Sequence, residues 1–235
     1  LSDELLDGLK IKENETVVDG TLGSGGHSLE ICRVGGKVIG IDADKKAVER
    51  SAEVLKECEV KLFQDNFRNI DKVLDSLKIN KVDKIFFDLG FNSEQLIGKG
   101  FSFQRDEPLT MTYKENPGEG DITAKEIVNN WDEETLRNIF LGYGEEKFSR
   151  VIAKKIVELR KEKPIESTFD LVEIIKKAVP VWYRHKRIHF ATKIFQALRI
   201  AVNDEIGALE EGLEKGFQRL EHWGRMAVIS FHSLE

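Results

Sequence analysis

The chain has 235 residues, of which 40% are hydrophobic and 33% are charged, and its formal net charge is −6. These values describe an ordinary globular protein with one large core, or with a core and a smaller second domain. No apolar run approaches the ~18 residues of a membrane-spanning helix and no signal-peptide pattern opens the chain, so we expect a cytoplasmic protein; the negative charge disfavours a general nucleic-acid binder without excluding a local basic patch.

The first informative segment joins a strand to a helix. The residues Thr16-Val17-Val18 predict a short strand, and Asp19-Gly-Thr-Leu-Gly-Ser-Gly-Gly-His-Ser28 follows it directly. Gly23, Gly25 and Gly26 can take positive φ or let a ligand lie on the backbone, and helical periodicity begins at about Ser28. A nucleotide-like cofactor is therefore expected at this loop.

The spacing of these glycines favours S-adenosylmethionine over a nicotinamide dinucleotide. A dinucleotide loop needs Gly-x-Gly-x-x-Gly, whereas here the glycines are clustered and the carboxylate of Asp19 suits a cofactor that carries a sulfonium and an ammonium group. The next predicted strand, residues 37–42, ends in Asp42, where a carboxylate accepts hydrogen bonds from the ribose of either cofactor. The alternative is that both acids only cap helices and the glycines only turn the chain.

Strands and helices alternate through the rest of the first hundred residues. We expect a helix at residues 45–58, a strand at 60–63, a helix at 69–77 and a strand at 84–87. This alternation predicts right-handed βαβ units in a doubly wound parallel sheet, which is an α/β fold. Ligands bind beyond the carboxyl ends of such strands. Four strand ends are therefore expected around one crevice: Asp19, Asp42, residues 65–67 and Asp88.

The alternation stops at about residue 103, and helical segments then follow one another. Asp132 and Thr168 are expected to cap two of them, and the predicted helices cover residues 133–141, 145–163, 169–178 and about 191–220. A strand pattern returns at residues 225–230.

These patterns predict two domains. An all-helical domain at residues 103–193 is inserted into a sheet domain that comprises residues 1–102 and 194–235. We expect the sheet domain to have further strands beyond the last residue, because the chain ends just after a strand-like run.

The helical insert carries a local excess of positive charge. Between Glu173 and Asp204 the chain has seven Lys or Arg and no acidic residue, and aromatic residues are interleaved with the cations. Since cations neutralise phosphates and aromatic rings stack on unpaired bases, this composition suits single-stranded or looped RNA. The candidate RNA contacts are Arg184, Lys186, Arg187, His189, Lys193 and Arg199. The alternative is a solvated helix end whose aromatic side chains fill the core of the insert.

Cys32 and Cys58 are the only cysteines. They form no CxxC motif, and the histidines have no metal-ligand spacing. We therefore expect no metal site and no disulfide framework, which agrees with a reducing compartment.

Six motifs in chain order resemble the MraW family, also called RsmH. They are Asp19-Gly-Thr-Leu-Gly-Ser-Gly-Gly-His-Ser28, Asp88-Leu-Gly90, Gly100-Phe-Ser-Phe103, Tyr143-Gly-Glu-Glu-Lys-Phe148, Phe195-Gln-Ala-Leu-Arg-Ile-Ala-Val-Asn203 and Ile229-Ser-Phe-His-Ser-Leu-Glu235. That family uses S-adenosylmethionine to methylate N4 of a cytosine in the decoding region of bacterial 16S (small-subunit) ribosomal RNA. The resemblance spans the whole chain and implies a Rossmann-like class I methyltransferase domain with a helical insertion.

The resemblance also implies partners. They are small-subunit ribosomal RNA, within an assembling 30S subunit, and no membrane. Exposed apolar residues on the insert leave a homodimer open.

Seven residues match cofactor contacts of the family: Gly25, Gly26, His27, Asp42, Phe67, Asp88 and Gln95. The resemblance implies that Asp42 binds the ribose, Phe67 lies beside the adenine, and Asp88 and Gln95 lie near the methionine end. From the residue types alone, Phe67 is equally a core aromatic, and His27 is equally a partner of the backbone.

The expected nucleophile is a cytosine amine, which is weak because its lone pair is delocalised into the ring. An enzyme must therefore position the amine and accept its N–H hydrogen bonds. Five side chains follow the fourth and the last strand and are candidates for this role: Asp88, Asn92, Ser93, His232 and Ser233.

Two segments depart from the family pattern. Residues 92–95 read Asn-Ser-Glu-Gln in place of Ser-Ser-Pro-Gln, and residues 107–114 read Glu-Pro-Leu-Thr-Met-Thr-Tyr-Lys in place of Gly-Pro-Leu-Asp-Met-Arg-Met-Asp. The lost charged residues leave a non-catalytic ribosome-assembly factor as an alternative function. A nicotinamide-dependent oxidoreductase is the second alternative.

Overall fold

The computed structural model describes residues 2–89, 98–114, 117–118, 120–231 and 233–234. The chain divides into two compact units. Unit 1 comprises Leu1–Asn92 and Ile206–Glu235, and unit 2 comprises Ser93–Glu205. Unit 2 thus extends beyond the predicted insert, residues 103–193, at both ends.

Unit 1 contains a parallel sheet of five strands. Their bounds are β1 Thr16–Asp19, β2 Lys37–Asp42, β3 Val60–Gln64, β4 Val82–Asp88 and β5 Leu220–Ile229. The spatial order is β3-β2-β1-β4-β5, and every pair of neighbours is parallel. This order is that of the first five strands of a Rossmann-like sheet, and the strand order reverses between β1 and β4, so the predicted α/β fold is confirmed.

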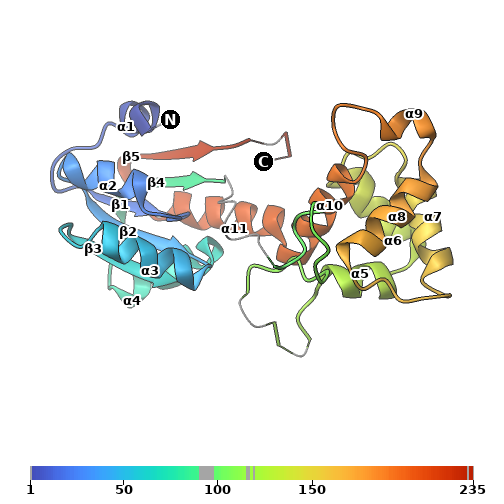
Figure 1. The fold of residues 1–235 in the computed structure, drawn as a ribbon. Coiled ribbons are helices and arrows are strands. Elements are labelled where there is room, and N and C mark those ends of the chain that lie inside the picture. The colour runs from blue at the N-terminus through green and yellow to red at the C-terminus, as the bar shows by residue number, and fades with distance from the viewer. Residues whose placement is uncertain (1, 90–97, 115–116, 119, 232, 235) are drawn as a thin grey trace. The chain divides into compact units, whose positions relative to one another are not determined.

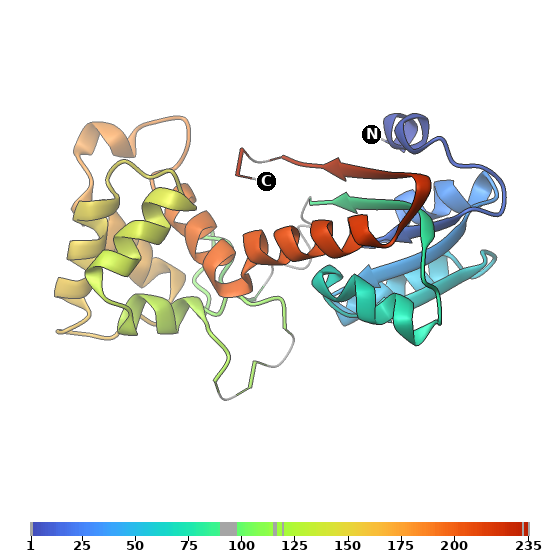
Figure 2. The same ribbon diagram turned by 180° about the vertical axis from the view of Figure 1, so that it is seen from behind.

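Successive residues of the central strands face opposite sides of the sheet. Val17 and Phe86 pack with one buried cluster, which includes residues of α1 (Ser2–Leu9) and α2 (Gly26–Arg33). Their chain neighbours Val18 and Phe87 pack with the other cluster, which includes residues of α4 (Ile70–Ser76) and α11 (Glu205–Gln218). Helices therefore cover both faces of the sheet, as the ribbon shows for this unit in Figures 1 and 2. Strands buried on both faces explain the continuous apolar runs in the sequence.

Two features of unit 1 were not predicted. Helix α1 contacts β5, and its residues Leu5 and Leu9 are buried. The short 3-10 helix η1 (Phe67–Asn69) follows β3, with Asn66 accepting a hydrogen bond from the Arg68 amide. Helix α3 (Lys45–Val54) ends earlier than the predicted residue 58.

Unit 2 is helical, as predicted. Its helices are α5 Ala124–Asn130, α6 Glu133–Gly142, α7 Ser149–Leu159, α8 Thr168–Ala178, α9 Val181–Arg184 and α10 Thr192–Asn203. They enclose one apolar core in which Phe140, Ile156 and Leu198 are fully buried. In the described part of this unit the only β pairing is a single bridge between Pro108 and Ser167.

The helix predicted at residues 191–220 is two helices. Asp204 interrupts it with a left-handed backbone, φ 48°, which Asp adopts more readily than most residues. The side-chain Nδ2 of Asn203 donates to the Met111 carbonyl at 2.8 Å, and its side-chain Oδ1 accepts from the Tyr113 backbone amide at 3.0 Å. These long-range hydrogen bonds favour a helix end at Asn203. They cannot be predicted from the helical periodicity of the sequence.

One helix cap was also predicted one residue late. Ser167, not Thr168, caps α8 by accepting from the Asp170 amide. Thr168 instead accepts from the Glu107 amide at 3.1 Å and donates to the Arg105 carbonyl at 2.6 Å, so its hydroxyl joins two segments of unit 2.

The expectation that the chain has no disulfide framework is wrong. Cys32 and Cys58 form a disulfide, with their Cα atoms 5.9 Å apart. Cys32 lies in the last turn of α2 and Cys58 lies just before β3, and the contact of α2 with α3 brings the two together. Spacing along the chain could not show this approach.

Candidate cofactor-binding and catalytic site

The glycine loop between β1 and α2 adopts the predicted conformation. Gly23 and Gly25 have positive φ, 54° and 80°, and Gly25 caps α2. At Gly26, no atom lies within 4 Å of the position that a Cβ would take. The backbone at the start of α2 is thus open to a ligand, and a helix N-terminus favours polar and negative groups.

Asp19 lies fully buried at the end of β1. Its carboxylate accepts hydrogen bonds from the Ser28 hydroxyl at 2.6 Å and the Thr21 amide at 3.1 Å. Burial raises the pKa of Asp19 to about 7, and the two hydrogen bonds and the neighbouring His27 oppose this rise. A cationic ligand beside this carboxyl group would stabilise its ionised form.

Asp42 lies at the end of β2 and ties that strand to the glycine loop. One carboxylate oxygen accepts from the Gly23 amide and the other from the Asp44 amide, both at 2.8 Å. Burial raises the pKa of this carboxyl group, while these two amides lower it. Each oxygen keeps a further lone pair, so the carboxylate can still accept hydrogen bonds from two ribose hydroxyls.

Asp88 and His27 form a pair between β4 and α2. The His27 Nε2 lies 3.3 Å from an Asp88 carboxylate oxygen, and its Nδ1 lies 3.2 Å from the Ser2 hydroxyl. The hydrogen bond to Asp88 raises the pKa of His27. The Asp88 amide donates to the Thr21 hydroxyl at 2.6 Å, a contact that the sequence did not single out. The predicted cofactor contact His27 therefore also orients the predicted catalytic carboxylate.

Phe67 lies after β3, in η1, and packs into unit 1. Its ring lies 5.3 Å from that of Phe87, and a Cβ at Gly212 of α11 would come within 2.7 Å of it. The side chain is half-buried, so one part of it fills the core and another part is accessible. An adenine contact at this ring stays a prediction.

Not every candidate can be placed. Asn92, Ser93, Gln95 and His232 lie outside the described residues. Ser233 is described and is exposed.

The predicted RNA contacts fall into two groups in unit 2. Three cations bind their own unit. The Arg184 guanidinium donates to the Val179 carbonyl, Lys193 donates to the Glu145 carbonyl at 2.8 Å, and Arg199 forms two hydrogen bonds with Glu205 at 2.9 and 3.0 Å. These contacts reduce what the three side chains can offer to RNA.

The remaining three RNA candidates are exposed. Lys186 and Arg187 lie on the loop after α9, and His189 stacks on Phe103 with ring centroids 4.4 Å apart. Partial burial of this ring lowers the pKa of His189. Lys147, which the sequence analysis did not select, lies beside the same aromatic residues as Lys186.

The segment at residues 107–114, which departs from the family pattern, makes internal contacts. The buried Glu107 carboxylate accepts from the Gly100 amide at 3.0 Å, and the Tyr113 hydroxyl donates to Glu205 at 2.9 Å. Thr110 donates to the Lys99 carbonyl at 2.8 Å. The replacement residues therefore have structural partners within unit 2.

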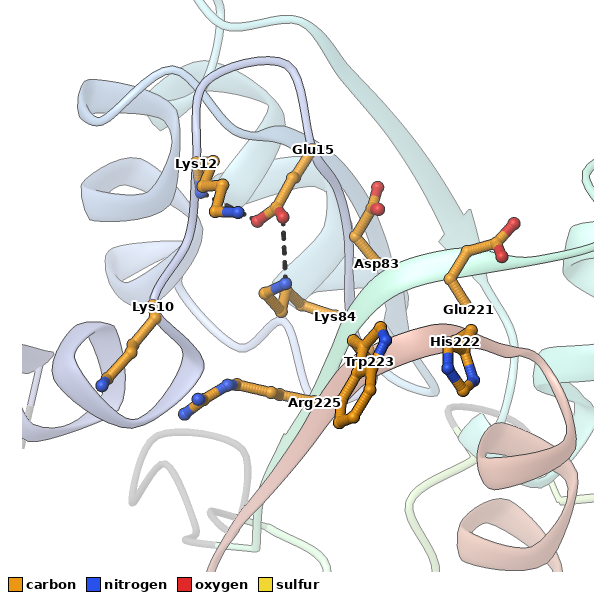
Figure 3. Close-up of a pocket in the computed structure, with 10 residues that line it drawn as sticks. Lys10, Lys12, Glu15, Asp83, Lys84, Glu221, His222, Trp223 and Arg225 are labelled. Atoms are coloured by element: carbon orange, nitrogen blue, oxygen red, sulfur yellow. Dashed lines mark hydrogen bonds and ion pairs between the residues drawn. The ribbon is translucent and has the colours of Figure 1, made fainter.

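A separate cavity of about 430 Å³ lies at the amino ends of β1, β4 and β5, the opposite edge of the sheet (Figure 3). Two of its charged groups form an ion pair, with Lys84 3.1 Å from Glu15, and Asp83 accepts a hydrogen bond from the Thr16 amide. This edge holds none of the predicted cofactor or catalytic residues that the structure describes.

Two further kinds of feature are absent from the described residues. No helix there is both long and apolar enough to span a membrane. No group of three or more His, Cys, Asp or Glu side chains there has the arrangement of a metal site.

Comparison with known proteins gives the relation of this chain to a family. The model of the MraW methylase family matches residues 1–235. The chain belongs to the MraW methylase family. It is 47% identical over 241 aligned positions to the ribosomal RNA small subunit methyltransferase H of Clostridium botulinum strain Loch Maree, and 46% identical to that of strain Kyoto, covering 100% of this chain and 77% of each relative.

Likeness to solved structures is weaker. An rRNA methylase from Streptococcus thermophilus has 22% identity and a TM-score of 0.32, over 38% of this chain and 52% of that one.

Membership of a methylase family identifies the cofactor as S-adenosylmethionine. The residues described above fit this group. The open backbone at Gly26 admits a ligand, Asp42 has lone pairs for a ribose, Asp88 offers a part-exposed carboxylate to a cation, and the buried Asp19 can act on a cation through its charge. The residue-by-residue assignment of these contacts stays a prediction.

Proposed function

We propose that this chain methylates N4 of a cytosine in the decoding region of small-subunit ribosomal RNA, using S-adenosylmethionine. The observation that carries the proposal is the cluster of carboxylates at the carboxyl ends of β1, β2 and β4, around an open glycine loop. The family, and relatives named ribosomal RNA small subunit methyltransferase H, support the substrate class.

In this proposal the chain binds the cofactor through residues at or after the carboxyl ends of the first four strands, β1 to β4. S-adenosylmethionine, when bound, supplies an electrophilic methyl group on a sulfonium. Asp42 accepts the ribose hydroxyls, the backbone of Gly25 and Gly26 contacts the cofactor, and Phe67 lies against the adenine. Gln95 contributes at the methionine end.

The acceptor amine is positioned by the residues that follow β4 and β5. Asp88 accepts an N–H of the amine and keeps negative charge beside the developing positive charge, with His27 and Thr21 holding it in place. Asn92, Ser93, His232 and Ser233 supply further acceptors and donors. The base leaves its stack to reach this position.

The RNA is held by unit 2. Lys186, Arg187 and His189 are exposed there, whereas Arg184, Lys193 and Arg199 contribute less because their side chains bind their own unit. The proposed setting is the bacterial cytoplasm, on a 30S subunit during assembly, with a homodimer left open.

Methyl transfer to small subunits that lack the modification tests the proposal. The chain is incubated with such subunits and tritiated S-adenosylmethionine, and the modified nucleotide is mapped by mass spectrometry. We expect one N4-methylated cytosine in the decoding region. Asp88→Asn, which keeps the size of the side chain and removes its charge, is expected to lower kcat by about 100-fold, the scale seen when one transition-state hydrogen bond is lost.

The same experiment separates the alternatives. Binding to subunits without methyl transfer would indicate a non-catalytic assembly factor, and methylation elsewhere would refute the proposed position. Calorimetry with S-adenosylmethionine and with NAD discriminates against an oxidoreductase, since we expect heat of binding only from the former. An Asp88→Asn variant with full activity would contradict the assigned role of Asp88.

A further inference from the structure

An aromatic cluster in unit 2 holds one tryptophan at the surface. Trp182 lies on α9 and is 56% exposed, and its ring makes T-shaped contacts with those of Tyr183 and Phe148, with ring centroids 5.8 and 6.0 Å away. Val181 and Ile188, which lie in the same segment of the sequence, are 62% and 55% exposed. An exposed tryptophan beside other exposed apolar side chains is characteristic of a contact surface.

Buried polar contacts fix the base of this cluster. The Tyr183 hydroxyl donates to the Glu146 carboxylate at 2.7 Å, and Glu146 is fully buried. The other Glu146 oxygen accepts from the Phe148 amide at 2.8 Å. Tyr183 also packs edge-on against Phe148, with centroids 4.8 Å apart. Trp182 therefore stands on a rigid support, which lowers the entropy lost on binding a partner.

Two lysines flank the exposed ring. The ammonium of Lys147 lies 4.6 Å from the Trp182 centroid, and that of Lys186 lies 5.5 Å from it. Lys147 comes from the segment before α7 and Lys186 from the loop after α9, so distant parts of the sequence bring both charges to one ring. The stretch of 30 residues between Glu173 and Asp204 adds no carboxylate that would repel a phosphate.

We propose that Trp182, with Lys147 and Lys186, is a stacking subsite for one unpaired nucleotide of the RNA substrate. This inference rests on the proposed function, because it presumes an RNA acceptor. The base lies on the indole, and the ammonium groups bind the flanking phosphates. A planar aromatic face with a cation beside it matches a nucleotide better than it matches an acidic peptide, which needs the cations and not the ring.

The magnitudes allow a base to replace a lysine at the ring. An exposed cation–π contact contributes about two- to fivefold to an equilibrium constant. Stacking of a base on an aromatic side chain contributes about five- to 150-fold. The base thus displaces the ammonium group from the ring, and the flexible lysine side chain then reaches a phosphate.

Binding of single-stranded RNA tests the subsite. The probe is a fluorescein-labelled oligouridylate of about 12 nucleotides, with a duplex of equal length for comparison, and affinity is measured by fluorescence anisotropy. We expect Trp182→Leu, which keeps apolar bulk and loses the aromatic face, to weaken binding about tenfold, and Trp182→Phe to weaken it much less. Phe169→Ala, at another aromatic residue that is 46% exposed in unit 2, is the control and should bind as the unchanged chain does.

The salt dependence of RNA affinity tests the roles of the two lysines. Lys147→Ala and Lys186→Ala should each lower the slope of log affinity against log salt by about 0.7, the value for one phosphate contact on a single strand. In methyl transfer to small subunits, Trp182→Leu should raise KM and leave kcat unchanged.

The outcomes distinguish this inference from the proposed function. If the unchanged chain methylates subunits and Trp182→Leu binds the oligonucleotide normally, the stacking subsite is refuted and the function stands. If Trp182→Leu impairs binding to subunits but not to free RNA, the occupant is a protein, which also refutes the subsite. If the tenfold loss is seen but no methyl is transferred, the subsite stands and the function fails.

Discussion

The buried carboxyl group of Asp19 makes both folding stability and ligand binding at the glycine loop depend on pH. It is 1% exposed, and burial raises its pKa from 3.8 to about 7. The folded chain without ligand therefore favours the protonated form, so Asp19 opposes folding increasingly as pH rises from about 4 through 7. A cationic ligand reverses this preference, because it is attracted only by the ionised carboxylate.

The affinity for S-adenosylmethionine is expected to rise with pH across neutrality. Below pH 7 binding must release a proton from Asp19, so the affinity should fall by up to about tenfold per pH unit. His27, whose pKa is raised by Asp88, acts in the same direction, since its protonated ring repels a cation. Calorimetry between about pH 5.5 and 8.5 measures the dependence.

The control for this prediction is Asp19→Asn, which cannot titrate. Burial also raises the pKa of Asp42, and the hydrogen bond to Asp88 raises that of His27, so the variant should retain a weaker dependence on pH. A slope that is unchanged in Asp19→Asn would assign the titration to another group.

For single residues, the sequence predicts where the carboxylates lie in the fold, but it does not predict which partners the charged side chains bind. The positions of Asp19, Asp42 and Asp88 follow from strand ends, which short apolar runs reveal. Arg184 and Arg199 form hydrogen bonds with the Val179 carbonyl and with Glu205 in their own unit. These side-chain contacts form only in the folded chain, so the sequence does not show them. A count of basic residues therefore overstates the charge available to RNA.

The contact of α11 with η1 connects a helix to the candidate adenine site. Gly212 lies inside α11, and a Cβ there would come within 2.7 Å of the Phe67 ring. Gly8 lies in α1, and no atom outside its own helix backbone lies within 4 Å of the position that a Cβ would take. The two glycines thus have the same helical backbone and opposite surroundings.

Gly212→Ala is expected to destabilise the chain, and Gly8→Ala is not. Alanine in a helix gains roughly 0.5–1 kcal/mol over glycine, whereas overpacking costs about 1–3 kcal/mol, so the clash decides the sign at Gly212 and helix propensity decides it at Gly8. Urea unfolding measures both. Gly212→Ala should also weaken cofactor binding by displacing Phe67; equal affinity in the two variants would separate Phe67 from the cofactor.

The disulfide joins the end of α2 to the segment before β3, within unit 1. Its cysteines are 26 residues apart, and closing such a loop stabilises the folded state by about 3.5 kcal/mol in the chain-entropy model. We expect reduction by dithiothreitol, or Cys32→Ala with Cys58→Ala, to speed amide hydrogen exchange in β2 and α3. Helices α6 and α7 in unit 2 are the internal control; equal loss of protection in both units would contradict a local effect.

Elements are predicted where local periodicity decides them. Strands β1 to β4 lie within two residues of their predicted bounds because each is a distinct apolar run. The end of α10 and the disulfide depend on contacts between distant residues, Asn203 with Met111 and Cys32 with Cys58, which no local pattern contains.

The two units of the whole molecule differ in charge. Unit 2, residues 93–205, carries 19 Lys or Arg against 19 Asp or Glu, a net charge of 0, while unit 1 carries 17 against 23, a net charge of −6. Unit 1 holds the described candidate cofactor residues, and unit 2 holds the candidate RNA residues. A cationic cofactor favours an acidic site, whereas RNA favours exposed cations. The chain meets these opposite requirements in different units.

Cofactor binding and RNA binding are therefore expected to be separable by substitution. Asp42→Asn should weaken S-adenosylmethionine binding at least tenfold, since the ribose loses charged acceptors, and leave oligouridylate affinity unchanged. Lys186→Ala should weaken RNA binding, most strongly at low salt, and leave cofactor affinity unchanged. Calorimetry and anisotropy on the same preparations give the four values. If either variant changed both affinities by similar factors, the two binding functions would not be divided between the units.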